Sequence, residues 1–271
     1  MLLSKKYKFI FIKSKKVAGT SVEVLLSNHL CDDDIVTPVS TLGFFNDIRR
    51  VEKDHEEDWR KKNKPARNYQ GSFIEETYLW MRQFQNYSKR LLINEFNRLF
   101  FTNKYLPIIH LKRGNRFYDH MPLEEVKRKL GSEVFKNYKT VSILRNPVEQ
   151  AISDYFDSNE RIETGRQYKN FEEYMDLRMD YFFNKVRKKF EINKKPAIDH
   201  FIKFESLKKD LKSFGKDINL NINVNELDKI KIHGQYRPNK NNEKENLIIN
   251  KNQRERIFKS AGWLSKFYEL T

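Results

Sequence analysis

The sequence predicts an α/β fold in which a central, mainly parallel sheet is flanked by helices within a single domain. Three observations favour this class. Short apolar runs typical of buried strands alternate along the chain with segments of helical periodicity, an order that favours parallel strands joined by helices. Two of these runs lead into a polar turn and then a helix, at 7–30 and at 140–153. A length of 271 residues suits one large domain spanning 1–271 and requires no second.

The first part of the chain predicts two strands separated by a helix. The apolar run Tyr7–Ile12 is interpreted as the first strand and Thr20 to about Leu30 as the first helix. Ile35 and Val36 form a short apolar pair before a Thr-Pro step, which suits a brief second strand. A lysine-rich turn with one glycine joins the first strand to the helix.

A helical insertion is expected at about 47–105. Charges crowd 47–64 with few apolar residues, which indicates a surface helix or loop. In 73–101, apolar side chains recur at alternating spacings of four and three, and this predicts a helix with one apolar seam. The seam comprises Phe73, Thr77, Trp80, Phe84, Tyr87 and Leu91. It either packs on this domain's own sheet, or forms a dimer contact or part of an acceptor cleft.

The remainder of the chain predicts further strands, each followed by a helix. The expected strands are at 108–111, 140–144 and 200–204. The expected helices are at 122–130, from 147, at 171–189, from 205–207 and at 253–268, the last with a possible break at Gly262. An Asn/Lys-rich stretch at 238–245 is interpreted as a loop. In a parallel sheet of this kind, a ligand binds at the carboxyl ends of the strands.

The segment 13–21, Lys-Ser-Lys-Lys-Val-Ala-Gly-Thr-Ser, is a P-loop-like candidate for binding a phosphate. The first N–H groups of a helix lack intrahelical partners and lie at the positive end of its dipole, so a strand, a turn and a helix start together favour an anion. Lys16 adds a positive charge, and the hydroxyls of Thr20 and Ser21 can donate hydrogen bonds to phosphate oxygens.

A second candidate for anion binding follows the strand at 140–144. Arg145 lies at the carboxyl end of that strand. Asn146 is a favourable N-cap, Pro147 suits the first helical position and Glu149 occupies the third. Ser153 then falls in the second helical turn, and a guanidinium with a hydroxyl near one sheet edge could hold a second phosphate.

Together these motifs resemble the sulfotransferase family, whose members use 3′-phosphoadenosine 5′-phosphosulfate (PAPS) and release the bisphosphate PAP. The closer resemblance is to the carbohydrate-type branch, which includes heparan and chondroitin sulfotransferases and has a lysine-containing loop ending in Ala-Gly-Thr-Ser. By this resemblance, one group binds the 5′-phosphosulfate: Lys16, Ala18, Gly19, Thr20 and Ser21. Arg145 and Ser153 would bind the 3′-phosphate, with Arg237 as a later basic contact.

The sequence also departs from the family pattern. Lys15 stands where proline is frequent, Val17 where threonine is common, Asn146 where aspartate is usual and Gln150 where a basic residue is frequent. None of these departures removes a group expected to contact phosphate.

The resemblance implies a general base and a group that stabilises the leaving oxygen. His120 precedes a predicted helix, as the base does in the carbohydrate-type branch, and histidine titrates near neutral pH. His110, in an apolar run, and Glu23, on the first helix, are the alternatives for the base. Lys16 is the candidate for stabilising the bridging oxygen, and Glu205 is expected to be structural. The mechanism requires no metal.

Composition limits the partners without choosing among them. The formal net charge of +16 predicts attraction to a polyanion, such as a phosphorylated cofactor, an acidic saccharide, an anionic membrane surface or nucleic acid. The resemblance to the carbohydrate-type branch implies a saccharide acceptor, which this charge would suit if the saccharide is acidic, and no specific binding of nucleic acid is expected. Cys31 is the single cysteine, and neither a signal peptide nor an apolar run long enough to span a membrane is evident. A cytoplasmic location is therefore expected.

Two other function classes remain open. A P-loop kinase would also place phosphate on a strand, turn and helix, but the Gly-x-x-x-x-Gly-Lys-Ser/Thr signature is absent. A non-enzymatic protein that binds nucleic acid or another polyanion would account for the charge and the many aromatic residues. It would not explain why hydroxyls, Lys16 and Arg145 gather at the ends of strands.

Overall fold

The computed structural model describes residues 1–31, 34–37, 117, 120–160, 167–230 and 247–269. Within these ranges the central sheet has five strands in the order β3-β1-β2-β4-β7. Their bounds are β1 Leu2–Ser4, β2 Phe9–Ile12, β3 Ile35–Val36, β4 Lys139–Leu144 and β7 His200–Lys203. β2, β4 and β7 run parallel, whereas β1 runs antiparallel to both of its neighbours. The predicted α/β fold with a mainly parallel sheet is confirmed.

The sheet contains one strand that the sequence did not predict. β1 precedes the strand expected to be first, and a turn over 5–8 returns the chain into β2. Only three apolar residues, Met1 to Leu3, mark it, and all three are buried. Asp34 fixes the turn, since its carboxylate accepts hydrogen bonds from the Ser4 hydroxyl at 3.2 Å and the Lys5 N–H at 2.7 Å. Pairing with β2 and β3, rather than local sequence, therefore makes this segment a strand.

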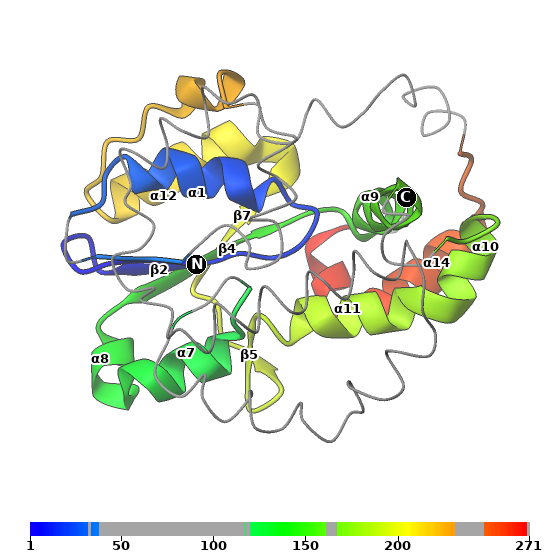
Figure 1. Cartoon of the computed structure of the whole chain (residues 1–271), viewed down its shortest axis with the longest axis horizontal. Helices are drawn as coiled ribbons and strands as arrows, with labels where there is room; N and C mark the ends of the chain where they lie inside the picture. The colour runs from blue at the N-terminus through cyan, green and yellow to red at the C-terminus, as the bar shows by residue number, and fades with distance from the viewer. Residues whose placement is uncertain (32–33, 38–116, 118–119, 161–166, 231–246, 270–271) are drawn as a thin grey trace, which may run out of the picture.

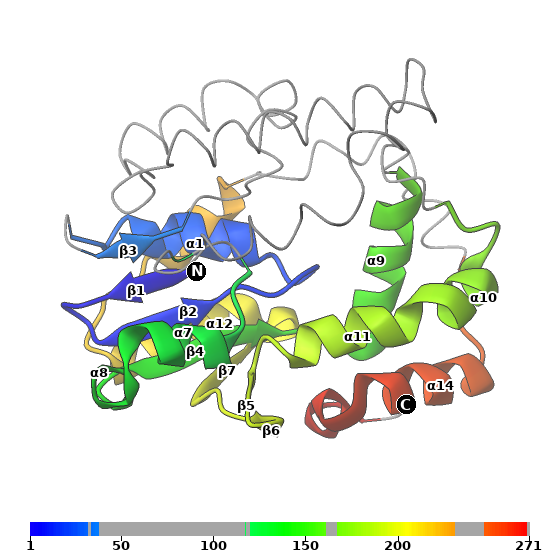
Figure 2. The same ribbon diagram turned by 60° about the horizontal axis from the view of Figure 1, so that its bottom comes forward.

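Helices cover both faces of the sheet (Figures 1 and 2). On one face lie α1 (Gly19–Ser27) and α12 (Leu207–Asp217). On the other side the core includes α7 (Leu123–Leu130), α9 (Pro147–Glu160), α11 (Asp180–Arg187) and α14 (Lys251–Ala261).

The pleat of β2 divides the core into two clusters. Phe9 and Phe11 pack with side chains of α1 and α12, and the ring of Phe9 meets Phe214 edge-on at 5.8 Å between centroids. Ile10 and Ile12 point into the opposite cluster. Successive side chains of a strand alternate between faces, so both sides of β2 are buried.

The later elements agree with the sequence prediction in position. The helix expected at 171–189 consists of α10 (Phe171–Tyr174), a π-helical segment (Met175–Met179) and α11. The final helix α14 ends at Gly262, whose φ of 63° places it in the left-handed region. Smaller elements complete the described part: α8 Ser132–Lys136, β5 Glu191–Ile192, β6 Lys195–Pro196, and 3-10 turns at Phe204–Ser206, Val224–Asp228 and Gly262–Phe267.

Several sequence predictions fall outside the described residues. They are the helical insertion at 47–105 with its seam at 73–101, the strand at 108–111 and the loop at 238–245. Among the helices that are described, none combines the length and the apolar character needed to cross a membrane.

Candidate active site

The three parallel strands bring their carboxyl ends to one edge of the sheet. In the register of the sheet, Ile12 pairs with Ser142, and Leu144 pairs with Lys203. The residues that follow these strands are Lys13, Arg145 and Phe204. Both candidate anion-binding motifs therefore lie at the same edge, as the sequence predicted.

Contacts from α9 and from the end of β4 hold the loop after β2. Gln150 Nε2 donates to the Lys15 carbonyl at 2.8 Å, and Arg145 Nη1 donates to the Lys16 carbonyl at 3.1 Å. The C=O and N–H of one peptide point in opposite directions, so the N–H groups of Lys16 and Val17 point away from these donors. Gln150, at a position where the family often has a basic residue, has a clear structural role here.

The backbone of the loop includes two residues with positive φ. Lys16 and Ala18 both lie in the left-handed region, with φ of 63° and 54°, although neither is glycine. Left-handed and right-handed residues in succession turn neighbouring N–H groups toward a common point. Ala18 is also the N-cap of α1 and makes no side-chain hydrogen bond to the helix. Thr20 and Ser21 follow in the first turn, half-buried.

One face of α9 lies against this loop. Gln150 contacts it through Lys15, and Asp157 Oδ1 lies 3.0 Å from the Lys16 ammonium. Ser153 is three residues after Gln150 and four before Asp157, so it lies on the same helix face. The hydroxyl that the sequence assigned to the second phosphate therefore belongs to the face that meets the first motif.

The buried Arg145 side chain belongs to the second motif and contacts the loop of the first. Its side chain is 9% exposed, and its guanidinium lies 4.5 Å from the centre of the Phe204 ring. Nη1 reaches the Lys16 carbonyl, while Nη2 lies 3.4 Å from Glu149 Oε2. A planar guanidinium fixed in this way is suited to forked binding of a phosphate.

The start of α9 is fixed by both local and distant groups. Asn146 caps the helix as predicted, because its Oδ1 accepts a hydrogen bond from the second helical N–H at 2.9 Å. The Asn146 N–H is not bound by Glu149, the third helical residue. It donates to Glu205 Oε1 at 2.7 Å, and Glu205 Oε2 accepts from the Tyr268 hydroxyl at 3.0 Å. These contacts give Glu205 a structural position, next to the anion-binding edge.

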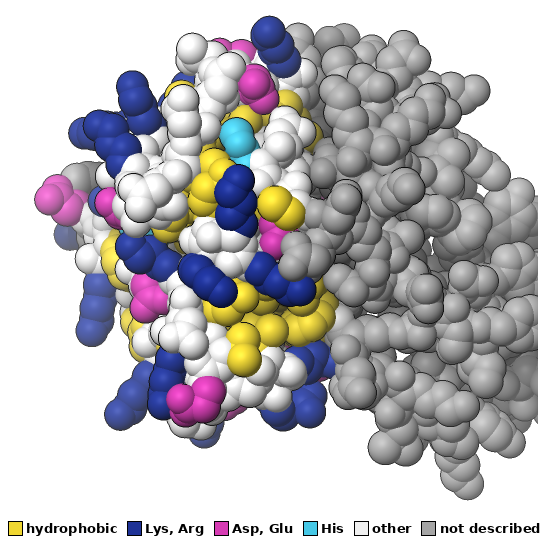
Figure 3. All heavy atoms as spheres, turned by 90° about the vertical axis from the view of Figure 1, so that its left-hand side faces the viewer, with side chains coloured by type: hydrophobic (Ala, Val, Ile, Leu, Met, Phe, Trp, Pro, Cys, Tyr) yellow, Lys and Arg dark blue, Asp and Glu magenta, His cyan; other side chains and the backbone are white. Residues whose placement is uncertain are grey.

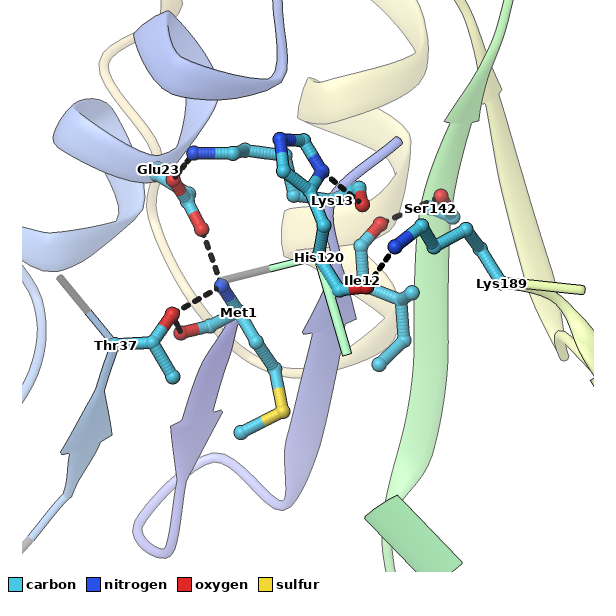
Figure 4. A network of polar contacts seen from close by, with 8 residues as sticks. All are labelled: Met1, Ile12, Lys13, Glu23, Thr37, His120, Ser142 and Lys189. Carbon is cyan, nitrogen blue, oxygen red and sulfur yellow. Dashed lines mark hydrogen bonds and ion pairs between the residues drawn. The ribbon is translucent and has the colours of Figure 1, made fainter. Parts of the chain in front are cut away.

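His120 lies beside the start of the phosphate loop (Figure 4). Its Nδ1 is 3.1 Å from the Lys13 carbonyl. A carbonyl oxygen only accepts hydrogen bonds, so Nδ1 carries the proton and Nε2 carries the lone pair. Burial, with the positive charges of Lys13 and Lys189, lowers the pKa of His120 to about 3. The ring is therefore neutral at physiological pH, the form that can accept a proton.

A buried ion pair lies beneath the loop, and sequence reasoning did not find it. Lys13 Nζ is 2.7 Å from Glu23 Oε2, and both side chains are nearly inaccessible, at 3% and 2% exposed. Burial by itself would raise the pKa of Glu23, but Lys13 and the N-terminal ammonium, which lies 2.5 Å from Oε1, hold it below its usual value. Glu23, the alternative base, is thus an ionised carboxylate with both oxygens engaged.

A signal for this pair was present in the sequence. Phe9, Phe11 and Lys13 alternate along the strand, and alternation places all three on the face covered by α1. Gly19 adds a second signal, since a Cβ there would lie 2.6 Å from Lys13 Cγ. The lysine side chain passes so close to the helix start that only glycine fits.

The residues present fit a phosphosulfate group. The N–H groups of the loop, the start of α1 without a side-chain cap and Lys16 supply donors and positive charge, and Arg145 with Ser153 supplies a second set. The hydroxyl of Ser14 is buried and has no hydrogen-bond partner among the residues described, so a polar group in the loop is left unsatisfied. In the same ranges, no group of three or more His, Cys, Asp or Glu side chains is arranged to hold a metal ion. Arg237 and His110 lie outside the described residues.

Comparison with known proteins gives one match. The model of a family described as "Sulfotransferase domain" matches residues 44–268, which is most of the chain. This match includes Arg145 and Ser153 and begins after the loop at 13–21. No match was found among curated proteins or among solved structures.

Proposed function

The chain belongs to the sulfotransferase family, and from this premise we propose that it transfers a sulfuryl group from PAPS to a hydroxyl or amine of an acceptor. The observation that carries the proposal is the meeting of two anion-binding elements at one sheet edge. The loop at 13–21 contacts the face of α9 through Gln150 and Asp157. Arg145, buried behind the loop, donates directly to it.

Two phosphate-binding roles follow from this arrangement. The loop N–H groups, the start of α1 and the Lys16 ammonium would hold the 5′-phosphosulfate. Arg145 and Ser153 would hold the 3′-phosphate, and Arg237 is proposed as a further contact. When bound, PAPS supplies a sulfuryl group whose leaving oxygen belongs to its 5′-phosphate. Lys16 would stabilise the negative charge that develops on that oxygen, an effect worth on the order of 100-fold in rate.

His120 is the proposed general base. In its Nδ1–H tautomer the ring presents Nε2 as the proton acceptor. A pKa of about 3 makes a weak base, but a polyanion in the loop opposes the positive charges of Lys13 and Lys189. Binding of the cofactor would therefore raise the pKa of His120 toward the range in which a general base is effective.

The acceptor is proposed to be an acidic saccharide. The Ala-Gly-Thr-Ser ending of the loop supports the carbohydrate-type branch, and the net charge of +16 favours a polyanionic partner. On the face drawn in Figure 3, Lys and Arg side chains are spread over the described surface rather than gathered in one patch. Such a distribution supports attraction of an extended polyanion more than recognition of a single site. A cytoplasmic location and a dimer contact through 73–101 stay predictions.

The proposal is tested by thermal stabilisation with adenosine 3′,5′-bisphosphate, using ATP and AMP as comparators. Ligand at a hundred times its dissociation constant should add about 2.7 kcal/mol to the free energy of unfolding. Arg145→Ala should lose this stabilisation. The matched control is Arg128→Ala, because Arg128 lies on α7 with its side chain 69% exposed and should leave binding intact.

Each outcome of this experiment is decisive. Selective stabilisation by the bisphosphate, lost only in Arg145→Ala, would support PAPS as the donor and lead to a screen of acceptors with His120→Asn as the inactive control. Stabilisation only by ATP with Mg²⁺ would favour a kinase. A protein that responds to no nucleotide but binds oligonucleotides after Lys16→Ala would be a polyanion-binding protein.

A further inference from the structure

Lys13 connects three parts of the candidate site: the loop at 13–21, helix α1 and His120. It follows the last residue of β2, and its side chain continues the face of Phe9 and Phe11 toward α1. Figure 4 shows the chain of contacts: the ammonium reaches Glu23, and the carbonyl of the same residue faces His120. Lys13 is thus the first residue of the loop, and it contacts both α1 and the proposed base His120.

The side chain ties the two ends of the loop together. It leaves the chain at the first loop residue and passes Gly19, where an added Cβ would lie 2.6 Å from Lys13 Cγ. It ends on Glu23, in the second turn of α1, at 2.7 Å. Because the pair is buried, removing one partner would leave an uncompensated charge inside the protein. The left-handed residues Lys16 and Ala18 are therefore held between two anchored ends.

The same residue determines the state of His120. The Lys13 carbonyl accepts the Nδ1 proton, which selects the tautomer. Three charged groups act on the ring: Lys13 from the loop, Lys189 from the turn after α11 and Glu23 from α1. Lys189 also donates to the His120 carbonyl. Burial lowers the pKa of His120 most, and the charges of Lys13 and Lys189 lower it further. The hydrogen bond to the Lys13 carbonyl and the charge of Glu23 raise it.

We propose that Lys13 is a positioning residue that couples the phosphate loop to His120: its ion pair with Glu23 fixes the loop on α1, and its carbonyl and ammonium fix the tautomer and charge of the imidazole. This inference rests on the proposed function for its catalytic meaning. It assigns a task to the first lysine of the segment 13–21, to which the motif gave no role of its own, and to the buried carboxylate beside it.

Two single variants separate this role from a purely structural one. Lys13→Met and Glu23→Gln both break the pair and both destabilise the protein, but they change the charge near His120 in opposite directions. NMR titration of the His120 ring in the ligand-free protein should show a pKa about one unit or more higher in Lys13→Met. In Glu23→Gln the pKa should stay at or below the wild-type value, and Lys13→Arg should preserve it.

A second measurement needs no variant. The ¹⁵N shifts of the wild-type His120 ring at neutral pH should report a neutral imidazole with the proton on Nδ1. A charged ring, or a proton on Nε2, would overturn the proposal. So would equal shifts of the His120 pKa in Lys13→Met and Glu23→Gln, because a loss of packing alone predicts the same direction for both.

Binding data complete the test and keep it distinct from the proposed function. Both variants should bind adenosine 3′,5′-bisphosphate roughly ten-fold more weakly than wild type, since each releases one anchor of the loop. Wild-type affinity in both would overturn the anchoring role. A wild-type protein that does not bind the bisphosphate would instead refute the proposed function, while the state of the His120 ring would still be decided by NMR.

Discussion

The buried, neutral His120 should make the stability of the protein depend on pH in a way that one substitution removes. Its pKa is about 3 in the folded protein and about 6.5 in the unfolded chain. Between these values the unfolded chain binds more protons than the folded protein, so the free energy of unfolding falls as the pH falls. Each pH unit below 6.5 costs about 1.4 kcal/mol, and lowering the pH from 7.5 to 5.0 should cost roughly 2 kcal/mol through this residue.

His120→Asn is the variant that isolates this contribution. His120 has a φ of 58°, and asparagine tolerates the left-handed region better than most residues. Its side-chain N–H can also replace the imidazole as a donor to the Lys13 carbonyl. The variant should therefore fold, and it should lose the pH-dependent part that His120 contributes.

Urea unfolding at the two pH values provides the measurement. Wild type should lose roughly 2 kcal/mol more than His120→Asn on going to pH 5.0. His29 and His200, whose pKa values are also lowered by burial, are present in both proteins and do not affect the difference. Equal losses in the two proteins would refute a buried, neutral His120.

Two further substitutions test the loop and its neighbours. Asp157→Asn should bind adenosine 3′,5′-bisphosphate about two- to five-fold more tightly. The partly exposed pair of Asp157 with Lys16 is worth at most about 1 kcal/mol and must be given up when the ligand binds. Isothermal titration measures the affinity, and Asp228→Asn, at an exposed position, is the control that should leave it unchanged. Gly19→Ala should destabilise the protein by about 1–3 kcal/mol, because the new Cβ would lie 2.6 Å from Lys13 Cγ. Thermal unfolding measures this, and an unchanged Tm would contradict the close approach of Lys13 to Gly19.

Local signals in the sequence were sufficient where a motif acts on its own neighbours. The strand before Arg145, the Asn146 cap and the break at Gly262 are all present, since each depends on a few adjacent residues. Signals failed where a distant group replaced a local one. Glu149 stood at the right spacing to bind the Asn146 N–H, yet Glu205, 59 residues away, takes that place. β1 was not predicted because its three residues are too short a signal, and pairing with β2 and β3, which its own sequence does not reveal, makes it a strand.

The candidate site shows the same division. Lys16 and Arg145 were predicted from local patterns, and the ends of parallel strands bring them into contact. Ser153 lies on the face of α9 that meets the loop, and the binding roles of all three stay predictions. Lys13 was overlooked because a lysine in a basic loop is normally exposed, and only its pairing with Glu23 explains its burial. Asp157 could not be assigned from the sequence, since its contact with Lys16 depends on how α9 crosses the loop.

The carboxylates beside the two cations bear on which ligand the site prefers. Lys16 lies 3.0 Å from Asp157, and Arg145 lies 3.4 Å from Glu149. Each cation of the proposed phosphate sites thus has an acidic neighbour in the ligand-free protein, which lowers the gain from binding any single anion. A ligand with one phosphate can compete with only one of these carboxylates, whereas a bisphosphate of the right span competes with both. Under the proposed function, removing both carboxylates should therefore strengthen binding of adenosine 3′,5′-bisphosphate by more than it strengthens binding of AMP, because the bisphosphate must open both pairs and AMP only one.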